Sequence, residues 1–302
     1  MMSVIGNSTA AFYTRGTGQM ADLRRTAERM QEQIATGERL SRSSDDPLAA
    51  ARLRTLERTD RLAAVDKENA SRAASDLTLA GEALDQIAGD LIRVRELAVQ
   101  SANGTLSAEA RQAIGVEIAQ LRSGIIAAAN ARDASGNPLL AGEGNGDAYT
   151  VSASGDAVYT GTAEAGELAL GDGQTVTRSV PGPQFMTFAS GGTQIDLSAF
   201  LKSLGDALQT GATSDSTSLT KLDDALDNLT RTQTVLGARL SWVEIVQDRH
   251  LVMEEARAQG MADTGGVDFA TTVARLQETL TALEASQAGF ARLSSLTLFD
   301  AI

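Results

Sequence analysis

The sequence predicts a mainly α-helical protein: a long antiparallel helical bundle, with paired coiled-coil helices at the two termini and a small β-rich insert between the helical halves. Three observations predict this. Apolar residues recur in steps of three and four near both ends. The composition is 42% hydrophobic but only 4% aromatic, which suits cores of Leu, Ile, Val and Ala in long helices. Glycines crowd between residues 133 and 198, where the helical pattern is lost.

The first heptad stripe lies at residues 20–37. Its apolar members are Met20, Leu23, Ala27, Met30 and Ile34. Arg, Glu and Gln fill the positions between them, as in a coiled-coil seam. Residues 40–46 interrupt the stripe, and Asp46 followed by Pro47 is typical of a helix start, with Asp as the N-cap and proline at the first helical position. We therefore predict that a second helix begins at residue 47.

The second predicted helix runs from residue 47 to residue 102, where Asn103 and Gly104 end it. Its apolar positions are Leu53, Leu56, Leu77, Leu84, Ile87, Leu91, Val94 and Ala98. A third helix is predicted to open at Ser107, with a stripe made of Ile114, Ile118, Leu121 and Ile125. Because the connection is short, the two helices should pack as an antiparallel hairpin.

The glycine-rich segment, residues 133–198, is predicted to be the β-rich insert. Short runs of β-branched and aromatic residues at 148–151, 157–160 and 175–177 are typical of strands joined by tight turns. Asp133 and Asn137 flank a stretch that resembles an oxygen-rich cation loop, but it lacks the distal bidentate Glu, so a turn is expected. Residues 142–146 match neither a phosphate-binding loop nor a dinucleotide fingerprint and are also expected to be turns.

Helical patterning resumes at Leu197 and continues to the C-terminus. One stripe consists of Leu219, Leu222, Leu226, Leu229, Gln233, Leu236, Leu240 and Val243. We predict that this stripe is core inside the molecule, and that residues 260–266 form a hinge after it. The last stripe consists of Phe269, Val273, Leu276, Leu280, Leu283, Gln287 and Phe290.

Composition also excludes several functions. The formal net charge of −13 opposes binding to nucleic acid, which draws on clustered Lys and Arg. No cysteine is present, so no disulfide or thiolate site can form. His250 is the one histidine, and we expect it to lie on a solvated helix face rather than to bind a metal. Asp45 and Asp46 are explained by helix capping better than by acid–base chemistry, so no enzyme activity, metal or cofactor is predicted.

The two terminal stripes are predicted to form an assembly interface. A single amphipathic helix is marginal in water, because its stability comes from burying the apolar stripe on a partner. The predicted interface consists of Met20, Leu23, Ala27, Met30, Ile34, Phe269, Val273, Leu276, Leu280, Leu283 and Phe290. We expect three regions: a terminal assembly domain (residues 1–44 and 261–302), a helical bundle (45–132 and 199–260) and the insert (133–198).

Three segments of the sequence resemble the bacterial flagellins and the flagellin-like hook-associated proteins. The first runs from QIATGERL at residues 33–40 into SSDDPLAAA at 43–51, and the second is RVRELAVQSANGT at 93–105. The third joins LEAS at 283–286 to LSSLTLFD at 293–300. Within the family, the Asp-Asp-Pro triplet and the ending at 300–302 resemble a subunit that joins hook to filament; the alternative is flagellin, the filament subunit itself.

The resemblance implies a structural protein of the bacterial flagellum that assembles through its terminal helices. Its implied partners are copies of itself, other hook-associated and flagellin subunits, and a type III export chaperone. It implies an extracellular location, reached through the flagellar type III system without a cleaved signal peptide. The N-terminal residues show no basic segment followed by a long apolar run, and no later stretch is long and apolar enough for membrane insertion.

Overall fold

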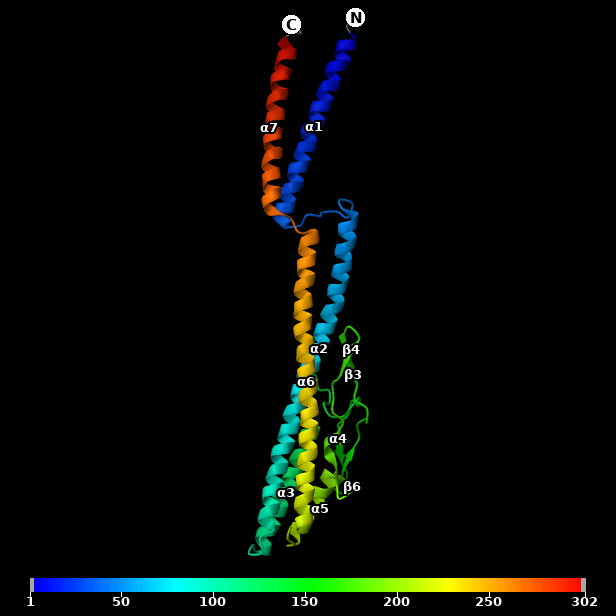
Figure 1. Ribbon diagram of the computed structural model, residues 1–302, viewed down its shortest axis with the longest axis vertical. Helices are drawn as coiled ribbons and strands as arrows, with labels where there is room; N and C mark the ends of the chain where they lie inside the picture. Colours follow the sequence, from blue (N-terminus) through cyan, green and yellow to red (C-terminus); the bar gives the residue numbers. More distant parts are fainter. Residues whose placement is uncertain (1–2, 300–302) are drawn as a thin grey trace. The chain divides into compact units, whose positions relative to one another are not determined.

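A computed structural model describes the backbone of residues 3–299 and the side chains of residue 11 and residues 13–292. The described part of the chain is mainly helical, which confirms the predicted fold class (Figure 1). Its helices are α1 (Ser3–Thr36), α2 (Pro47–Ser101), α3 (Ala108–Ala129), α4 (Pro183–Met186), α5 (Leu197–Gln209), α6 (Ser216–Gly265) and α7 (Phe269–Phe299). Its strands are β1 (Tyr149–Val151), β2 (Ala157–Tyr159), β3 (Glu167–Gly171), β4 (Gln174–Thr177), β5 (Thr187–Ser190) and β6 (Thr193–Asp196).

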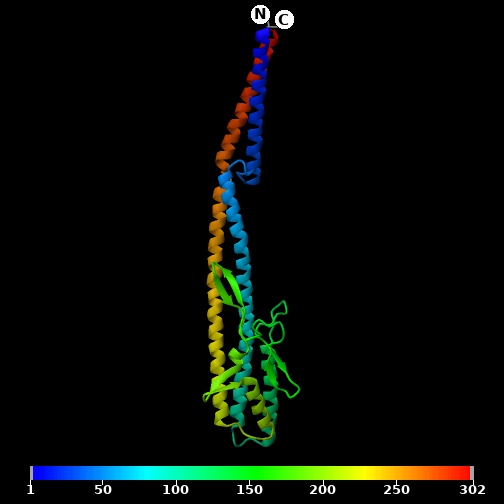
Figure 2. The same cartoon turned by 90° about the vertical axis from the view of Figure 1, so that its right-hand side faces the viewer.

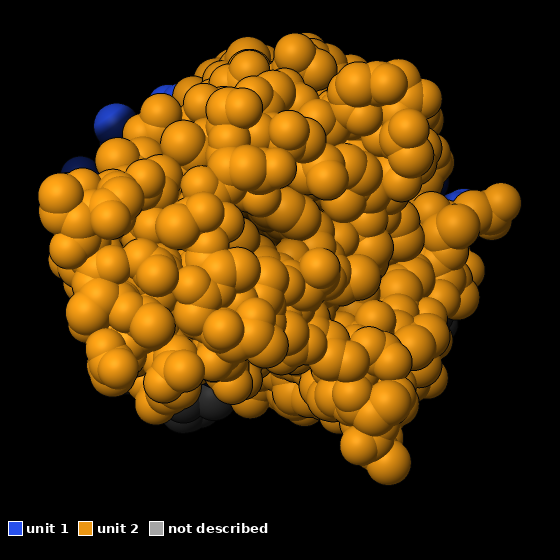
Figure 3. Space-filling view, turned by 90° about the horizontal axis from the view of Figure 1, so that it is seen from below, with its two compact units in different colours: residues 1–61, 253–302 blue, residues 62–252 orange. Residues whose placement is uncertain are grey.

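The chain divides into two compact units, which Figure 3 distinguishes by colour. Unit 1 comprises residues 1–61 and 253–302, and unit 2 comprises residues 62–252. Helices α2 and α6 each contribute one part to each unit. The β-rich segment belongs to the same compact unit as the bundle beside it. The three-region division drawn from the sequence remains a prediction.

Unit 2 is a bundle in which α2, α3, α5 and α6 lie side by side (Figures 1 and 2). The apolar positions predicted along α2 from Leu77 onward are buried in one continuous core. The predicted stripe of α6 joins the same core, with Leu222, Leu229, Leu236 and Val243 buried. Its one polar member, Gln233, donates from Nε2 to Asp85 Oδ1 of α2 at 2.7 Å. This stripe is therefore core within the molecule, as predicted.

Side-chain caps begin the helices where the sequence indicates. Ser107 Oγ accepts a hydrogen bond from the backbone N–H of Ala110 at the start of α3, at 3.2 Å. Asp196 does the same for Ala199 at the start of α5, at 2.8 Å. Such caps satisfy one of the backbone N–H groups that have no partner in the first turn of a helix.

Three antiparallel hairpins, β1–β2, β3–β4 and β5–β6, make up the insert, and they lie along one side of the bundle (Figures 1 and 2). The first hairpin pairs Tyr149 with Tyr159, and their rings lie 5.2 Å apart between centroids. The strands predicted at 148–151, 157–160 and 175–177 are confirmed. Strands β3, β5 and β6 and the short helix α4 were not predicted, because each has only four or five residues and shows too little of a periodic pattern.

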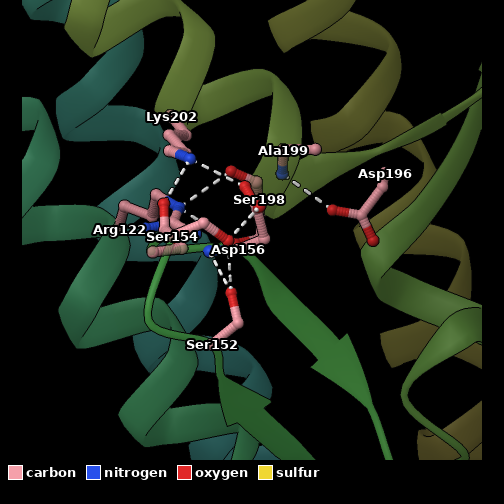
Figure 4. A network of polar contacts seen from close by, with 9 residues as sticks. Arg122, Ser152, Ser154, Asp156, Asp196, Ser198, Ala199 and Lys202 are labelled. Atoms are coloured by element: carbon pink, nitrogen blue, oxygen red, sulfur yellow. Dashed lines mark hydrogen bonds and ion pairs between the residues drawn. The ribbon is translucent and has the colours of Figure 1, made fainter.

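A polar network fastens the first hairpin to the bundle (Figure 4). Arg122 of α3 is buried, and its Nε donates to Ser198 O at 2.8 Å and to Ser198 Oγ at 2.9 Å. Its Nη2 reaches Gly155 O in the hairpin turn at 2.7 Å. Lys202 of α5 donates from Nζ to Ser154 O and to Asp156 Oδ1, both at 2.7 Å. This bond to Lys202 is the main cause that lowers the pKa of Asp156.

Single side chains hold the insert elsewhere. Asn130 pairs with the backbone of Tyr149 in both directions at 2.8 Å, as a neighbouring strand would. His250 is half-buried, and its Nε2 lies 2.8 Å from Leu170 O in β3. The prediction that His250 lies on a solvated helix face was therefore wrong: the ring ties hairpin β3–β4 to α6.

The hinge predicted at residues 260–266 overlaps the break after α6 only at Gly266, so most of it was misplaced. Helix α6 continues to Gly265, and Thr264 Oγ1 bonds to Gly260 O at 2.7 Å. The glycines are used for close packing within unit 1, because a Cβ built on Gly265 would lie 2.8 Å from Leu53 Cδ1 of α2. The helix breaks only between Gly265 and Phe269.

Helices α3 and α5 approach each other closely at Gly115, which gives a first prediction. A Cβ at this residue would lie 2.7 Å from Gly205 O and 2.8 Å from the backbone N of Gln209. We expect Gly115→Ala to lower the free energy of unfolding of unit 2 by ~1–3 kcal/mol, because backbone atoms must move apart. The matched control is Gly89→Ala in α2, where a Cβ meets nothing within 4 Å. This control should raise the free energy of unfolding by ~1 kcal/mol, because alanine has a higher helix propensity than glycine. Denaturant unfolding followed by circular dichroism measures both.

Asp76 gives a second prediction, because it is a buried carboxylate on α2 with 7% of its surface exposed. Burial raises its pKa, and the nearby Asp133 adds to the shift while Arg178 and Arg72 oppose it. The folded state therefore binds the Asp76 proton more tightly than the unfolded state. Stability falls as pH rises through the folded pKa.

We expect Asp76→Asn to be more stable than the parent at neutral pH, and this advantage should shrink toward zero as pH falls below the normal pKa range of aspartate. The exposed Glu82→Gln on the same helix serves as the control and should leave the pH profile unchanged. Thermal midpoints across an acidic to neutral series measure the effect. An advantage that does not vary with pH would contradict the assignment.

Candidate assembly interface

Helices α1 and α7 pack against each other in antiparallel directions within unit 1 (Figures 1 and 2). At one end, the ring of Phe269 lies 3.8 Å from the position of a Cβ on Gly37. At the other end, the ring of Phe290 lies edge-on to Tyr13, with centroids 5.2 Å apart. The termini predicted to meet therefore do meet along these helices.

On α1, the side turned to α7 is the predicted stripe. Ala27 is buried at 4% exposure. The other four predicted members, Met20, Leu23, Met30 and Ile34, are half-buried. The intervening positions are mostly exposed, so the heptad phase of this helix was read correctly from the sequence.

On α7, the buried side is rotated relative to the predicted stripe. The half-buried positions are Thr272, Leu276, Thr279, Leu283, Ser286 and Phe290. Only Leu276, Leu283 and Phe290 of these belong to the predicted stripe. The predicted members Phe269, Val273 and Leu280 are exposed, at 53%, 39% and 36%. Helix α7 thus offers one apolar edge to α1 and leaves a second apolar edge uncovered within the described chain.

Unit 1 has almost no core of its own. Among the side chains that the structure describes, its buried hydrophobic residues are two alanines, Ala27 and Ala50, whereas the large buried side chains all belong to unit 2. A hollow of about 410 Å³ lies between the helices beside Gly16, Met20, Ser286 and Phe290. Full burial of a Leu or Phe side chain is worth ~1.5–3 kcal/mol, so half-buried residues leave part of that stabilisation unused.

A short backbone clasp joins the base of the two terminal helices, between residues 37–39 and 265–267. Arg39 N donates to Gly265 O at 2.7 Å, and Val267 N donates to Gly37 O at 3.0 Å. The Arg39 side chain adds a bond from Nη2 to Thr264 O at 2.9 Å. Gly37 adopts φ = 76°, a left-handed conformation that glycine reaches without strain and that turns the chain out of α1.

The Asp-Asp-Pro triplet acts as a turn and a cap beside this clasp. Asp46 Oδ1 accepts the N–H of Ala49 at 3.0 Å in the first turn of α2, which begins at Pro47. This backbone bond is the main cause that lowers the pKa of Asp46, and Arg39 contributes. Asp45 Oδ2 accepts the N–H of Arg42 at 3.0 Å. The capping interpretation is confirmed for Asp46, whereas Asp45 stabilises the turn before α2 and caps no helix.

Other chemistry that the sequence raised has a local structural explanation. Asp133 Oδ1 accepts the N–H groups of Ser135 and Asn137, at 2.9 and 2.7 Å, so this segment is a turn. Within the described residues, no group of three or more His, Asp or Glu side chains is placed to hold a metal ion. No described helix is long and apolar enough to cross a bilayer. The feature of unit 1 that could bind a partner is its apolar helical surface.

Comparison with known proteins adds to this geometry. A family model for the bacterial flagellin N-terminal helical region matches residues 11–145. The N-terminal part of the chain is therefore similar to the bacterial flagellins. It is 25% identical over 289 residues to flagellar hook-associated protein 3 of Escherichia coli K12, an alignment that covers 89% of this chain and 90% of that protein. Of the sequence segments that resemble this family, the one at 93–105 begins on α2 and runs past Ser101 into the following turn, and LEAS at 283–286 lies on α7. Residues 293–302 lie outside the described side chains.

Two further relatives show how far along the chain the similarity to each kind of flagellar protein extends. A flagellar filament 33 kDa core protein of Treponema phagedenis is 29% identical over 139 residues, which is 46% of this chain and 48% of that protein. Among solved structures, a putative flagellar hook-associated protein from Vibrio parahaemolyticus shares the fold, with a TM-score of 0.66 and 21% identity. That match covers 74% of this chain and all of the other. Similarity to the hook-associated proteins thus extends further along the chain than similarity to this filament protein.

The contact between Gly16 and Phe290 gives a third prediction. A Cβ on Gly16 would lie 3.1 Å from Phe290 Cδ2, whereas a Cβ on Gly18, two residues along the same helix, meets nothing within 4 Å. We expect Gly16→Val to weaken the α1–α7 pair by ~1–3 kcal/mol, because the ring is displaced. Gly18→Val is the control, and the stability of its α1–α7 pair should stay within ~0.5 kcal/mol of that of the parent. Hydrogen exchange of α1 and α7 in the full chain measures the difference, and equal exchange in the two variants would contradict this packing.

Proposed function

We propose that this chain is a structural subunit of the bacterial flagellum that joins hook to filament and assembles through its terminal helices. The observation that carries the proposal is similarity to hook-associated protein 3 along 89% of the chain. Within it, the partners are copies of the chain and other hook-associated and flagellin subunits. Export through the flagellar type III system with the help of a chaperone, and a location in the extracellular flagellum, belong to the same proposal. The role is structural and involves no catalysis.

The geometry of unit 1 supports assembly as the purpose of the terminal helices. Two paired helices can bury only the sides that face each other, and here even those sides are half-buried. Phe269, Val273 and Leu280 form a second apolar edge on α7. Contact with neighbouring subunits would remove this edge from water at ~25 cal/mol per Å² of apolar area, which favours association.

The predicted interface therefore separates into two roles. Met20, Leu23, Ala27, Met30 and Ile34, with Leu276, Leu283 and Phe290, hold α1 and α7 together. Val273 and Leu280, together with the exposed part of Phe269, contact other subunits. A variant of the first set should damage the pair itself, whereas a variant of the second set should damage only assembly.

Deletion of residues 269–302 tests the proposal as a whole and is the fourth prediction. We expect the truncated chain to be soluble and monomeric, because unit 2 keeps its core, and to fail to join hook ends. Negative-stain microscopy of hook ends mixed with the full-length chain and with the truncated chain measures this. Incorporation of the truncated chain would overturn the role of α7.

Substitutions on the two edges of α7 sharpen the same test. Val273→Asp with Leu280→Asp should abolish incorporation and leave the hydrogen exchange of α1 unchanged. Leu276→Asp with Leu283→Asp should accelerate exchange in both helices. A control pair with the same added charge, Gln277→Asp with Thr281→Asp, replaces exposed polar residues on α7. If the control pair blocks incorporation as strongly as Val273→Asp with Leu280→Asp, the apolar edge has no special role.

The same mixtures decide between junction subunit and filament subunit. A junction subunit should add to hook ends in a short layer and then permit filament growth from flagellin. A filament subunit should grow long filaments from its own copies alone. Long filaments made of this chain would replace the junction role with that of flagellin.

A further inference from the structure

The chain contains two Asn-Gly pairs, and the structure treats them differently. Asn103-Gly104 lies in the turn between α2 and α3, and Asn145-Gly146 lies in the insert before β1. An Asn-Gly pair can react with itself, because glycine has no side chain to keep its backbone nitrogen away from the amide carbon of the preceding asparagine. Whether it reacts depends on how freely that amide can turn.

Asn103 is held in place from several directions. Its Oδ1 accepts the N–H of Thr105 at 3.1 Å and the Oγ1 hydroxyl of Thr105 at 2.9 Å. Its backbone N donates to Gln100 O at 3.2 Å, and its backbone O accepts the N–H of Leu106 at 3.1 Å. Both side-chain bonds must break before the amide carbon can approach the nitrogen of Gly104.

Asn145 has no such restraint. It is exposed, and within the described chain its side chain takes part in no hydrogen bond. Gly146 is exposed as well, its N–H has no bonded partner among the described residues, and a Cβ placed on it would meet nothing within 4 Å. The amide of Asn145 and the nitrogen of Gly146 are free to adopt the geometry of attack.

We propose that Asn145 is a site of spontaneous modification, at which the asparagine is converted to aspartate and isoaspartate without an enzyme. The backbone nitrogen of Gly146 attacks Cγ of Asn145 and loses its proton, and the bond from Cγ to Nδ2 breaks. Nδ2 leaves as ammonia and a five-membered succinimide remains. Water then opens either carbonyl of the ring, which gives aspartate or isoaspartate. The net reaction consumes one water and releases one ammonia.

The restraint at Asn103 sets the expected difference in rate. Two hydrogen bonds hold its Oδ1, and none holds that of Asn145. We expect Asn145 to react about thirtyfold faster than Asn103 in the folded chain, a ratio that corresponds to ~2 kcal/mol. Asn137 is excluded from this chemistry, because Pro138 has no backbone N–H and cannot close the ring.

The product would change a surface that is already acidic. A carboxylate at residue 145 would lie in sequence between Glu143 and Asp147, and Asp147 Oδ1 accepts from Arg132 Nη2 at 2.7 Å. The new charge would add to the negative charge that this short segment already carries. The isoaspartate form also adds one carbon to the backbone in the loop that precedes β1. This loop of the insert would therefore change its charge and its path as the protein ages.

Peptide mapping of the aged full-length chain tests the proposal. The protein is held folded at mildly alkaline pH, and samples are digested with trypsin over time. Peptide 133–178 contains Asn145 and Asn137, and peptide 96–111 contains Asn103. We expect the amide-to-acid mass change to accumulate in peptide 133–178 and to map to residue 145 by fragmentation. A folded chain in which residue 145 stays intact, or in which Asn103 reacts as fast, overturns the proposal.

Three controls tie the result to the structure. Gly146→Ala should slow the reaction at Asn145 and leave Asn103 unchanged. Thr105→Ala removes one of the two bonds to Asn103 Oδ1 and should raise the rate at Asn103 alone. In denaturant, the rates at Asn103 and Asn145 should converge. A thirtyfold ratio that persisted in the unfolded chain would show that folding does not cause the difference.

Discussion

The structure depends on a limit of two-helix packing: a pair of helices can hide only the strips that face each other. Unit 2 escapes this limit, because α2, α3, α5 and α6 surround a common core with apolar residues from four directions. Unit 1 does not. Its buried hydrophobic side chains, among those described, are Ala27 and Ala50. The two units therefore differ in kind, since one is stabilised from within and the other presents apolar surface that its own fold does not cover.

Where apolar packing is weak, hydrogen bonds at and beside the clasp fix the geometry of unit 1. Two backbone hydrogen bonds join residues 37–39 to 265–267, and Arg39 and Asp46 add side-chain bonds at the same place. Hydrogen bonds specify geometry better than they add stability, because each replaces bonds to water. The clasp sets where α1 ends and α7 begins, while the strength of the α1–α7 pair still depends on apolar contact.

The sequence predicted most of the fold, and its errors have physical causes. Heptad steps located the core of α6, since only one side of that helix is rich in Leu. The heptad steps misplaced the buried side of α7, because apolar residues cover two adjoining edges of that helix. Helix α1 packs against only one of them, which buries part of Leu276 and Leu283 and leaves Val273 and Leu280 exposed. A sequence with apolar residues on two adjoining edges does not say which edge faces its own chain.

The incorrect predictions for the glycines at 260–266 and for His250 have a related cause. Gly260 and Gly265 suggested a flexible hinge, but both lie within α6, and Gly265 lets Leu53 of α2 pack closely against it. His250 suggested a solvated surface, but a carbonyl of β3 lies within hydrogen-bond reach. In both cases the deciding neighbour is distant in sequence. Strands β3, β5 and β6 escaped detection because each has only four or five residues, too few for a periodic pattern to stand out.

The antiparallel pairing of α1 with α7 has a further consequence for how the protein is made. Its contacts join residues near positions 13–37 to residues near 269–290, so they have among the largest sequence separations in the chain. Loop closure on this scale carries a large entropic cost and comes late in folding. A chain that emerges from a ribosome or a narrow channel N-terminus first cannot form this pair until its last helix is released. Until then α1 waits without its partner, and unit 2 can already be folded.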